Sequence, residues 1–147
     1  MIKIKKFDEL TLNELYDILN LRAEIFVVDQ NCPYNDVDGK DKNSVHFMIW
    51  ENDKLEGYIR VIKPGISYDS ASIGRVIVRK SARHKGYAKK LLISGIEFIT
   101  NEWNENKIEI SAQTYLENFY KSLNFKTTSD VYLEDEIPHV HMIFEKN

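Results

Sequence analysis

Apolar and charged residues alternate at the start of the chain, and this alternation predicts a strand. Ile2, Ile4 and Phe7 are separated by lysines, as in a strand at the edge of a sheet. The segment Thr11-Leu12-Asn13-Glu14 is a capping box, which predicts a helix after it. We expect this helix to end before Pro33, because the residue before a proline disfavours the helical conformation. Its apolar residues recur at helical spacing and predict one buried face, made of Leu12, Leu15, Tyr16, Leu19, Ala23, Phe26 and Val27.

The later apolar runs predict a sheet and two more helices. Runs over 45–50 and 55–62 form a hairpin, and a run over 73–78 adds a third antiparallel strand. A helix after Gly86, a strand over 107–112, a helix over 116–123 and strands near 127–133 and 140–144 follow. The helix after Gly86 is expected to bury Ala88, Leu91, Leu92, Gly95, Ile96 and Ile99. The order β-α-β-β-β-α-β-α-β-β describes a single α+β domain over 1–147, whose mixed, mostly antiparallel central sheet is flanked by helices.

Composition and charge restrict the class of protein. A chain of 147 residues matches one domain, and a net charge of −3 argues against a general nucleic-acid-binding surface. The single cysteine, Cys32, excludes an intramolecular disulfide. No apolar run has transmembrane length, and the N-terminal residues lack the apolar core of a signal peptide. We therefore expect a cytoplasmic protein with neither nucleic acid nor membrane as a partner.

A basic segment with a glycine, Arg83-His84-Lys85-Gly86-Tyr87-Ala88, lies between a predicted strand and a predicted helix. A helix N-terminus offers unpaired N–H groups, and its dipole favours anions. Glycine has no Cβ, so the backbone at Gly86 can approach a ligand closely. The segment predicts a phosphate or pyrophosphate site, or else a solvated turn before the helix. It lacks the Gly-x4-Gly-Lys-Ser/Thr pattern of P-loops, which argues against an ATP or GTP site.

With this order of elements, Arg83-x-x-Gly86-x-Ala88 resembles the cofactor signature of the GCN5-related N-acetyltransferase (GNAT) superfamily. A second element, an asparagine and a tyrosine on the following short helix, is present as Asn118 and Tyr120. Asn124 replaces the usual glycine there, and asparagine tolerates the left-handed conformation that ends helices. Segments 21–30, 32–39 and 137–139 are similar to the ElaA-like branch, in which we expect glycine instead of Glu136. The resemblance runs from about residue 7 to residue 144.

The resemblance implies an acetyl-CoA-dependent N-acetyltransferase that passes the acetyl group directly to an amine, without a metal. A splay between two neighbouring strands would expose one strand to the pantetheine arm, and the basic segment would hold the pyrophosphate. The implied cofactor-binding residues are Val76, Ile77, Val78, Arg83, His84, Lys85, Gly86, Tyr87, Ala88 and Asn118. Tyr120 occupies the place of the catalytic tyrosine that hydrogen-bonds or protonates the leaving thiolate, although without the resemblance a tyrosine here is more typical of a packed core. A non-catalytic acyl-CoA-binding or regulatory module on the same fold is the alternative.

The acceptor amine is expected to bind at Gln30, Tyr34, Asp38, Arg75 and His139, in part on the long polar loop 30–43. It can be a small molecule or a peptide, and the resemblance also allows a homodimer. An ammonium must lose a proton before it attacks, and the candidate bases or anchors for a proton-carrying water are His139, Glu134, Asp135 and Asp38. Acidic residues of the loop 30–43 and of the segment 134–136 form either a negative acceptor pocket or solvated loop charges. They are Asp36, Asp38, Asp41, Glu134, Asp135 and Glu136.

Two further possibilities concern side chains that can bind metal or carry an acyl group. His139 and His141 alternate along a strand and face the same side, but a metal would need another ligand such as His46, so we expect none. Cys32 beside Pro33 is expected to be a small packing residue, with a covalent acyl-carrying role as the alternative.

Overall fold

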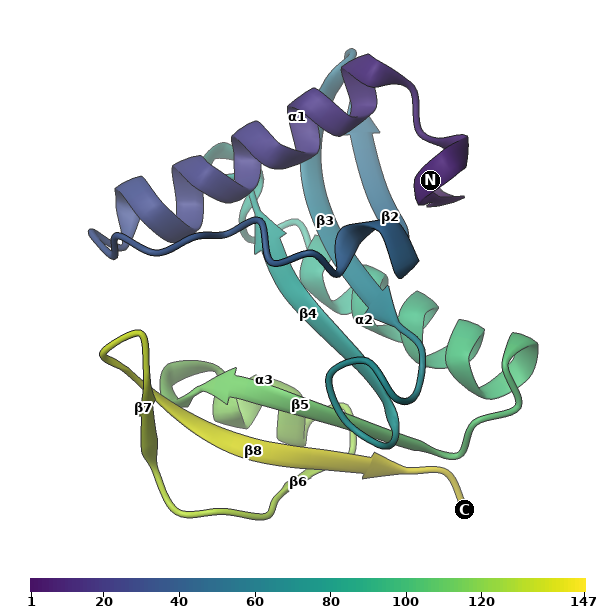
Figure 1. Cartoon of the computed structure of the whole chain (residues 1–147), viewed down its shortest axis with the longest axis vertical. Helices are drawn as coiled ribbons and strands as arrows, with labels where there is room; N and C mark the ends of the chain where they lie inside the picture. The colour runs from purple at the N-terminus through teal and green to yellow at the C-terminus, as the bar shows by residue number, and fades with distance from the viewer.

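The computed structural model describes residues 1–147 and contains one open, mixed sheet of eight strands (Figure 1). Along the sheet the order is β1-β2-β3-β4-β5-β8-β6, and β7 pairs with β8. The strands are β1 (Ile2–Lys6), β2 (Ser44–Glu51), β3 (Lys54–Ile62), β4 (Ala71–Val78), β5 (Lys107–Gln113), β6 (Phe125–Thr127), β7 (Tyr132–Glu134) and β8 (Ile137–Glu145). Every pairing is antiparallel except β4 with β5, so the predicted mixed, mostly antiparallel sheet is confirmed.

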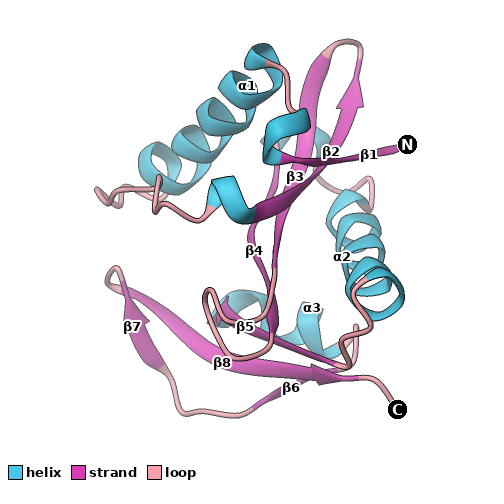
Figure 2. Ribbon diagram, turned by 45° about the vertical axis from the view of Figure 1, so that its right-hand side comes forward, coloured by secondary structure: helices cyan, strands magenta, loops and turns pink.

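Helices cover both faces of the sheet (Figure 2). Helix α1 (Leu12–Arg22), which a π-helical segment (Ala23–Asp29) continues, packs on one face. Helices α2 (Tyr87–Glu97) and α3 (Glu117–Lys121) pack on the other face, and α2 continues into a π-helical segment (Phe98–Glu102). The apolar residues between α2, α3 and the sheet form the larger core, and those under α1 form a smaller one.

The chain between β5 and the C-terminus contains three strands, not the two predicted. The predicted strand 127–133 is interrupted after Thr127 and resumes at Tyr132. In the interruption, the Ser129 hydroxyl accepts a hydrogen bond of 2.9 Å from the His141 backbone N–H of β8. A side chain has thus replaced a backbone acceptor, which ends regular pairing.

Helix α1 buries a different face from the one predicted. Leu12 and Tyr16 are 86% and 72% exposed, whereas Ile18, Leu21 and Ile25 are buried. The buried face also carries charged side chains, Glu14 and Arg22, which a hydropathy pattern assigns to solvent. The prediction was wrong because these charges are paired inside the protein, so the true buried stripe is only partly apolar.

The capping box at the start of α1 is confirmed, and its glutamate also ties the helix to β1. The Glu14 carboxylate accepts hydrogen bonds from the Thr11 N–H (2.9 Å), from Lys5 (2.9 Å) and from Lys3 (3.1 Å). Burial alone would raise the pKa of this carboxyl, but these hydrogen bonds and the Lys5 charge lower it from 4.5 to about 2.

This lowered pKa predicts a stability effect that depends on pH. A carboxyl whose pKa falls on folding stabilises the protein above its ordinary pKa, and this contribution is lost as pH falls through the lowered value. Glu14→Gln is therefore expected to be destabilised near neutral pH, with the difference from wild type shrinking as pH falls from about 4.5 towards 2. Urea unfolding of both proteins across this range measures the effect, and a difference that does not change with pH would contradict it.

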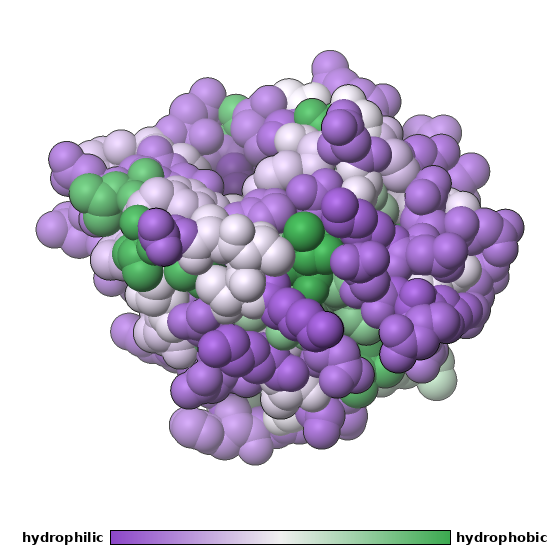
Figure 3. All heavy atoms as spheres, turned by 90° about the horizontal axis from the view of Figure 1, so that it is seen from below, coloured by the Kyte–Doolittle hydropathy of each residue, from purple (hydrophilic) through white to green (hydrophobic).

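Hydrophilic side chains predominate on the face drawn in Figure 3, where apolar residues gather only in small patches. None of the helices combines the length and the apolar character that a membrane crossing requires.

Candidate functional site

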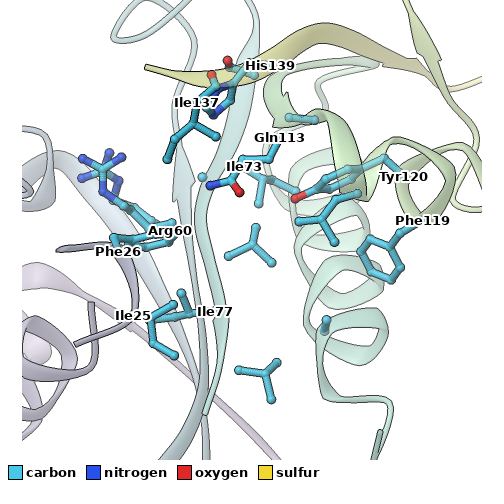
Figure 4. A pocket seen from close by; sticks show the side chains of 18 of the residues that line it. Ile25, Phe26, Arg60, Ile73, Ile77, Gln113, Phe119, Tyr120, Ile137 and His139 are labelled. Carbon is cyan, nitrogen blue, oxygen red and sulfur yellow. The ribbon is translucent and has the colours of Figure 1, made fainter. Parts of the chain in front are cut away.

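The sheet opens between its two parallel strands. β4 and β5 pair only at Ala71 with Ile108 and at Ser72 with Glu109. Beyond Ser72 the strands diverge, and residues of both strands line a cavity of about 680 Å³ (Figure 4). The edge of β4 from Ile73 onwards therefore has backbone groups without a strand partner on the cavity side. Such an edge is a template for an extended ligand.

A β-bulge changes the direction of β4 inside the splay. Its pairing with β3 shifts register between Tyr58 and Arg60, so Arg75 and Val76 together lie opposite Ile59. Arg75 has a φ of +51°, in the left-handed region that a non-glycine residue seldom adopts. Bulges of this kind often re-aim a strand beside an active site. The predicted Val76, Ile77 and Val78 all line the cavity here.

The N-terminus of α2 forms one end of the cavity. Gly86, at φ +78°, is the residue before the helix, and a side chain there would meet no atom within 4 Å. No side chain caps the helix, so the first-turn N–H groups are free for a ligand. Arg83 lines the same end, and its Nε donates to the Val78 carbonyl at 3.3 Å. Lys85 differs from expectation, because its ammonium lies 3.5 Å from Glu51 and its side chain is outside the cavity lining.

Tyr120 of α3 reaches the middle of the cavity from the β5 side of the splay (Figure 4). It is 5% exposed, and its ring packs edge-on against Phe119 and Phe125. No hydrogen bond joins its hydroxyl to the protein, and this oxygen is not among the fully buried atoms that lack a partner, so it remains accessible from the cavity. Burial raises the pKa of this phenol well above its ordinary value, which keeps it protonated. Asn118, two residues before Tyr120, does not line the cavity.

The polar loop 30–43 closes the other end of the cavity against the strands beyond the splay. Gln30 and Gln113 of β5 exchange side-chain hydrogen bonds of 3.3 and 3.5 Å. The Cys32 thiol, buried as predicted for a packing residue, donates to the Asp135 carbonyl at 3.2 Å. Asp135 and Glu136 form the turn between β7 and β8 with φ of +51° and +64°. The turn thus keeps left-handed geometry despite glutamate at the position where glycine was expected.

Asp36, Asp38 and Asp41 are neither a free negative pocket nor solvated charges. Each is paired with arginine: Arg22 lies 2.8 Å from Asp36 and 2.7 Å from Asp41, Arg60 lies 2.7 Å from Asp38 and 3.0 Å from Asp41, and Arg75 lies 2.8 Å from Asp36. Burial would raise the pKa of Asp38 and of Asp41, but the arginine hydrogen bonds and charges outweigh it and lower both values. Three arginines therefore neutralise the three aspartates, so the suggestion of an acidic pocket was wrong for this loop.

The same ion-pair cluster orients Tyr34 and Arg75 at the cavity wall. The Arg75 guanidinium lies 5.7 Å from the centre of the Tyr34 ring, and the Tyr34 hydroxyl donates to Asp36 at 3.3 Å. Burial is the largest cause that raises the Tyr34 pKa, and the Asp36 charge raises it further, whereas the Arg75 charge lowers it. The result is a pKa of about 12. His46 lies elsewhere, fully buried between Tyr58 and the Asp41 carbonyl, so it does not join His139 and His141.

A hydrogen-bonded group around His139 lies at the loop end of the cavity. His139 of β8 is 6% exposed and lines the cavity together with Glu134 of β7 and Ser111 of β5. The sequence analysis did not single out Ser111, Gln113 or Tyr132. The alternation of Glu109, Ser111 and Gln113 along β5 is the signal that points to a polar face there.

Most of the predicted site residues therefore line one cavity. Those that do are Gln30, Tyr34, Asp38, Arg75, Val76, Ile77, Val78, Arg83, His84, Gly86, Tyr87, Ala88, Tyr120 and His139. Lys85 and Asn118 do not. The cavity thus combines a splayed parallel strand pair, a helix N-terminus at one end and the side chain of Tyr120.

Comparisons with known proteins give the family. The model of the acetyltransferase (GNAT) domain matches residues 20–146, and the chain belongs to this family. Protein ElaA of Escherichia coli is 40% identical over 139 residues, which is 93% of this chain and 91% of ElaA. The crystal structure of ElaA superposes with a TM-score of 0.90 at 37% identity, covering 99% of both chains. An acyl-CoA N-acyltransferase from Pseudomonas aeruginosa superposes with a TM-score of 0.91 at 36% identity, covering 98% of this chain and 99% of that chain.

Proposed function

We propose that the protein is an N-acetyltransferase that transfers the acetyl group of acetyl-CoA directly to an amine in a ternary complex. Its family supports acyl transfer, and its relative from P. aeruginosa is described as an acyl-CoA N-acyltransferase. The observation that carries the proposal is the unpartnered Tyr120 hydroxyl, which faces a cavity bounded at one end by the N-terminus of α2. A binding module needs the helix N-terminus but has no need of a buried, protonated hydroxyl in the splay.

In this proposal, acetyl-CoA would lie along the cavity with its pyrophosphate at α2. Its pyrophosphate would lie against the first-turn N–H groups of α2, beside Gly86, and receive further donors from Arg83 and His84. Its pantetheine arm would run along β4 as an additional strand and hydrogen-bond the unpaired edge at Val76–Val78. The same stretch of backbone N–H groups can polarise the thioester carbonyl, where each such donor is worth up to ~3 kcal/mol in well-studied cases.

The chemistry then needs one leaving group and one nucleophile. A neutral amine attacks the thioester carbonyl, a tetrahedral intermediate forms, and the thiolate of coenzyme A leaves. Tyr120 would protonate or hydrogen-bond that thiolate, since burial keeps its hydroxyl protonated. The direct route is favoured over an acyl-cysteine intermediate because the Cys32 thiol, although it lines the cavity, donates to the Asp135 carbonyl and has no side-chain base as a hydrogen-bond partner to activate it.

Thiol release with a panel of amines tests the activity. Wild-type protein with acetyl-CoA is mixed with a polyamine, free amino acids, a peptide with a free N-terminus or a peptide with an internal lysine. We expect thiol release that depends on one of these amines, together with the matching acetylated product by mass spectrometry. Tight acetyl-CoA binding without acetylation of any amine would instead favour the non-catalytic module.

A further inference from the structure

His139 is the most tightly positioned titratable side chain at the end of the cavity opposite α2. Its Nδ1 lies 2.6 Å from the Ile137 carbonyl oxygen, which can only accept, so Nδ1 carries the proton. In the neutral ring the lone pair is then on Nε2. The ring stacks on Tyr132, with centroids 6.2 Å apart and planes 21° apart, which further restricts its rotation. The structure therefore presents one defined basic nitrogen to the cavity that His139 lines.

Glu134 is aimed at this nitrogen by two hydroxyl groups. The Tyr132 hydroxyl lies 2.6 Å from Ser111 Oγ, and Ser111 donates to Glu134 Oε1 at 2.9 Å, so the tyrosine is the donor to the serine. The other carboxylate oxygen, Oε2, lies 3.6 Å from His139 Nε2. With the His139 ring neutral, both of these atoms are acceptors, and no donor of the protein lies between them. Two acceptors held this way create a place for an N–H group from outside the protein.

We propose that His139 is the general base that removes a proton from the acceptor ammonium, and that Glu134 holds this ammonium beside it. The proposal rests on the proposed acetyltransferase function and selects one base from several acidic and basic candidates. Asp38 is not available, because Arg60 and Arg75 pair with it. Asp135 contributes its carbonyl to Cys32 and lies in the turn, with no hydrogen-bonded support of its carboxylate.

The proton balance is complete with these groups. The acceptor ammonium gives one proton to Nε2, and the freed lone pair forms the C–N bond with the thioester carbonyl carbon. The C–S bond breaks and its electron pair leaves with sulfur, which takes a proton from Tyr120. The nitrogen loses its second proton as the amide forms, and this proton restores Tyr120. His139 passes its proton to solvent by way of Glu134, whose side chain is half exposed.

The decisive comparison is His139→Asn against His141→Asn. Asparagine keeps an N–H donor for the Ile137 carbonyl but has no basic nitrogen, and His141 lies two residues along β8 outside the cavity lining. With the amine identified in the thiol-release panel, kcat of His139→Asn is expected to fall by about 10²- to 10⁴-fold at neutral pH. The dissociation constant for acetyl-CoA is expected to stay unchanged, and His141→Asn is expected to resemble wild type.

A pH profile separates a base from a structural role. The kcat/KM of His139→Asn for the amine is expected to rise about tenfold per pH unit, because the variant depends on amine already deprotonated in solution, whose pKa is about 10.4 if lysine-like. The kcat/KM of wild type is expected to level off at a lower pH, because His139 removes the proton from the bound ammonium. The titratable groups that face this part of the sheet are Tyr132 and Glu134 of β7, Asp135 and Glu136 of the adjoining turn, and His141 of β8 with its partner Glu109 of β5. Cys32, Asp38 and Arg75 line the same cavity. Glu134→Gln, at a half-exposed position that folding tolerates better, is expected to raise KM for the amine.

The outcomes distinguish the two proposals. Wild-type thiol release with a normal kcat and an unchanged pH profile in His139→Asn would overturn the role of His139 alone. Absence of amine-dependent thiol release from wild type would overturn the proposed function itself. If His139→Asn does not fold, ¹⁵N NMR of the wild-type protein shows which ring nitrogen of His139 carries the proton. The spectrum is recorded at about pH 8, above the ordinary histidine pKa of about 6.5. A proton on Nε2 there would overturn the assignment of this atom as the base.

Discussion

Gly86→Glu is expected to abolish acetyl-CoA binding. The substitution puts a carboxylate at the residue that precedes α2, where the side chain of any other residue enters open space at the end of the cavity. Two like charges about 4 Å apart repel by about 4 kcal/mol at an effective dielectric constant of about 20. An energy of this size lowers affinity by about a thousandfold. Strain adds to the effect, because glutamate must adopt the positive φ of +78°.

Gly65→Glu is the matched control for this prediction. Gly65 also has a positive φ, +89°, and open space beside its Cα, but it does not line the cavity. The control therefore introduces the same side chain and similar strain without charge at the proposed pyrophosphate site. Isothermal titration of both variants with acetyl-CoA measures the difference. Equal affinity of Gly86→Glu and Gly65→Glu would mean that the N-terminus of α2 does not bind the cofactor.

Tyr120→Phe is expected to lower kcat by about 100-fold while acetyl-CoA affinity changes little. A positioned proton donor contributes about 10²- to 10⁴-fold to a reaction, and a thiol with a pKa near 8.5 is a good enough leaving group to place the effect at the lower end. The substitution keeps the ring that packs against Phe119 and Phe125. It removes only a hydroxyl without a hydrogen-bond partner in the protein, so the melting temperature is not expected to fall.

Tyr16→Phe is the control, because Tyr16 lies exposed on α1 and outside the cavity lining. Steady-state kinetics with the identified amine, together with thermal melting, separate the two roles of Tyr120. A normal kcat in Tyr120→Phe would make it a packing residue. A lower melting temperature with a normal kcat would give the same answer and would add that the hydroxyl supports the fold.

Local patterns along the chain predicted the elements that depend mainly on neighbours in sequence. The capping box at Thr11 is confirmed because both of its hydrogen bonds lie within four residues. The hairpin of β2 and β3 and the helix after Gly86 followed from period and turn residues in the same way. The uncapped helix start after Gly86 was predictable as well, since a glycine before an amphipathic helix is a local signal, and its role in anion binding stays a prediction.

Features that depend on distant partners were not predictable from these patterns. The buried face of α1 was misplaced because Arg22 pairs with Asp36 and Asp41, 14 and 19 residues away in sequence. The role of those aspartates was missed for the same reason. The network of Ser111, Tyr132 and Glu134 around His139 joins three strands, β5, β7 and β8, and only the sheet order brings them together. Charge pairing across such distances has no signature in hydropathy or spacing.

Calorimetric titration of the protein with acetyl-CoA, with ATP as the control ligand, tests the central claim most directly. The claim is that the splay between β4 and β5, with the N-terminus of α2 at one end, binds acetyl-CoA. ATP shares the adenosine and phosphates but has no pantetheine arm to pair with β4. The account predicts a dissociation constant for acetyl-CoA of about 1 μM or below, corresponding to roughly −8 kcal/mol, and far weaker binding of ATP. Absence of acetyl-CoA binding, or equal affinity for both ligands, would contradict it.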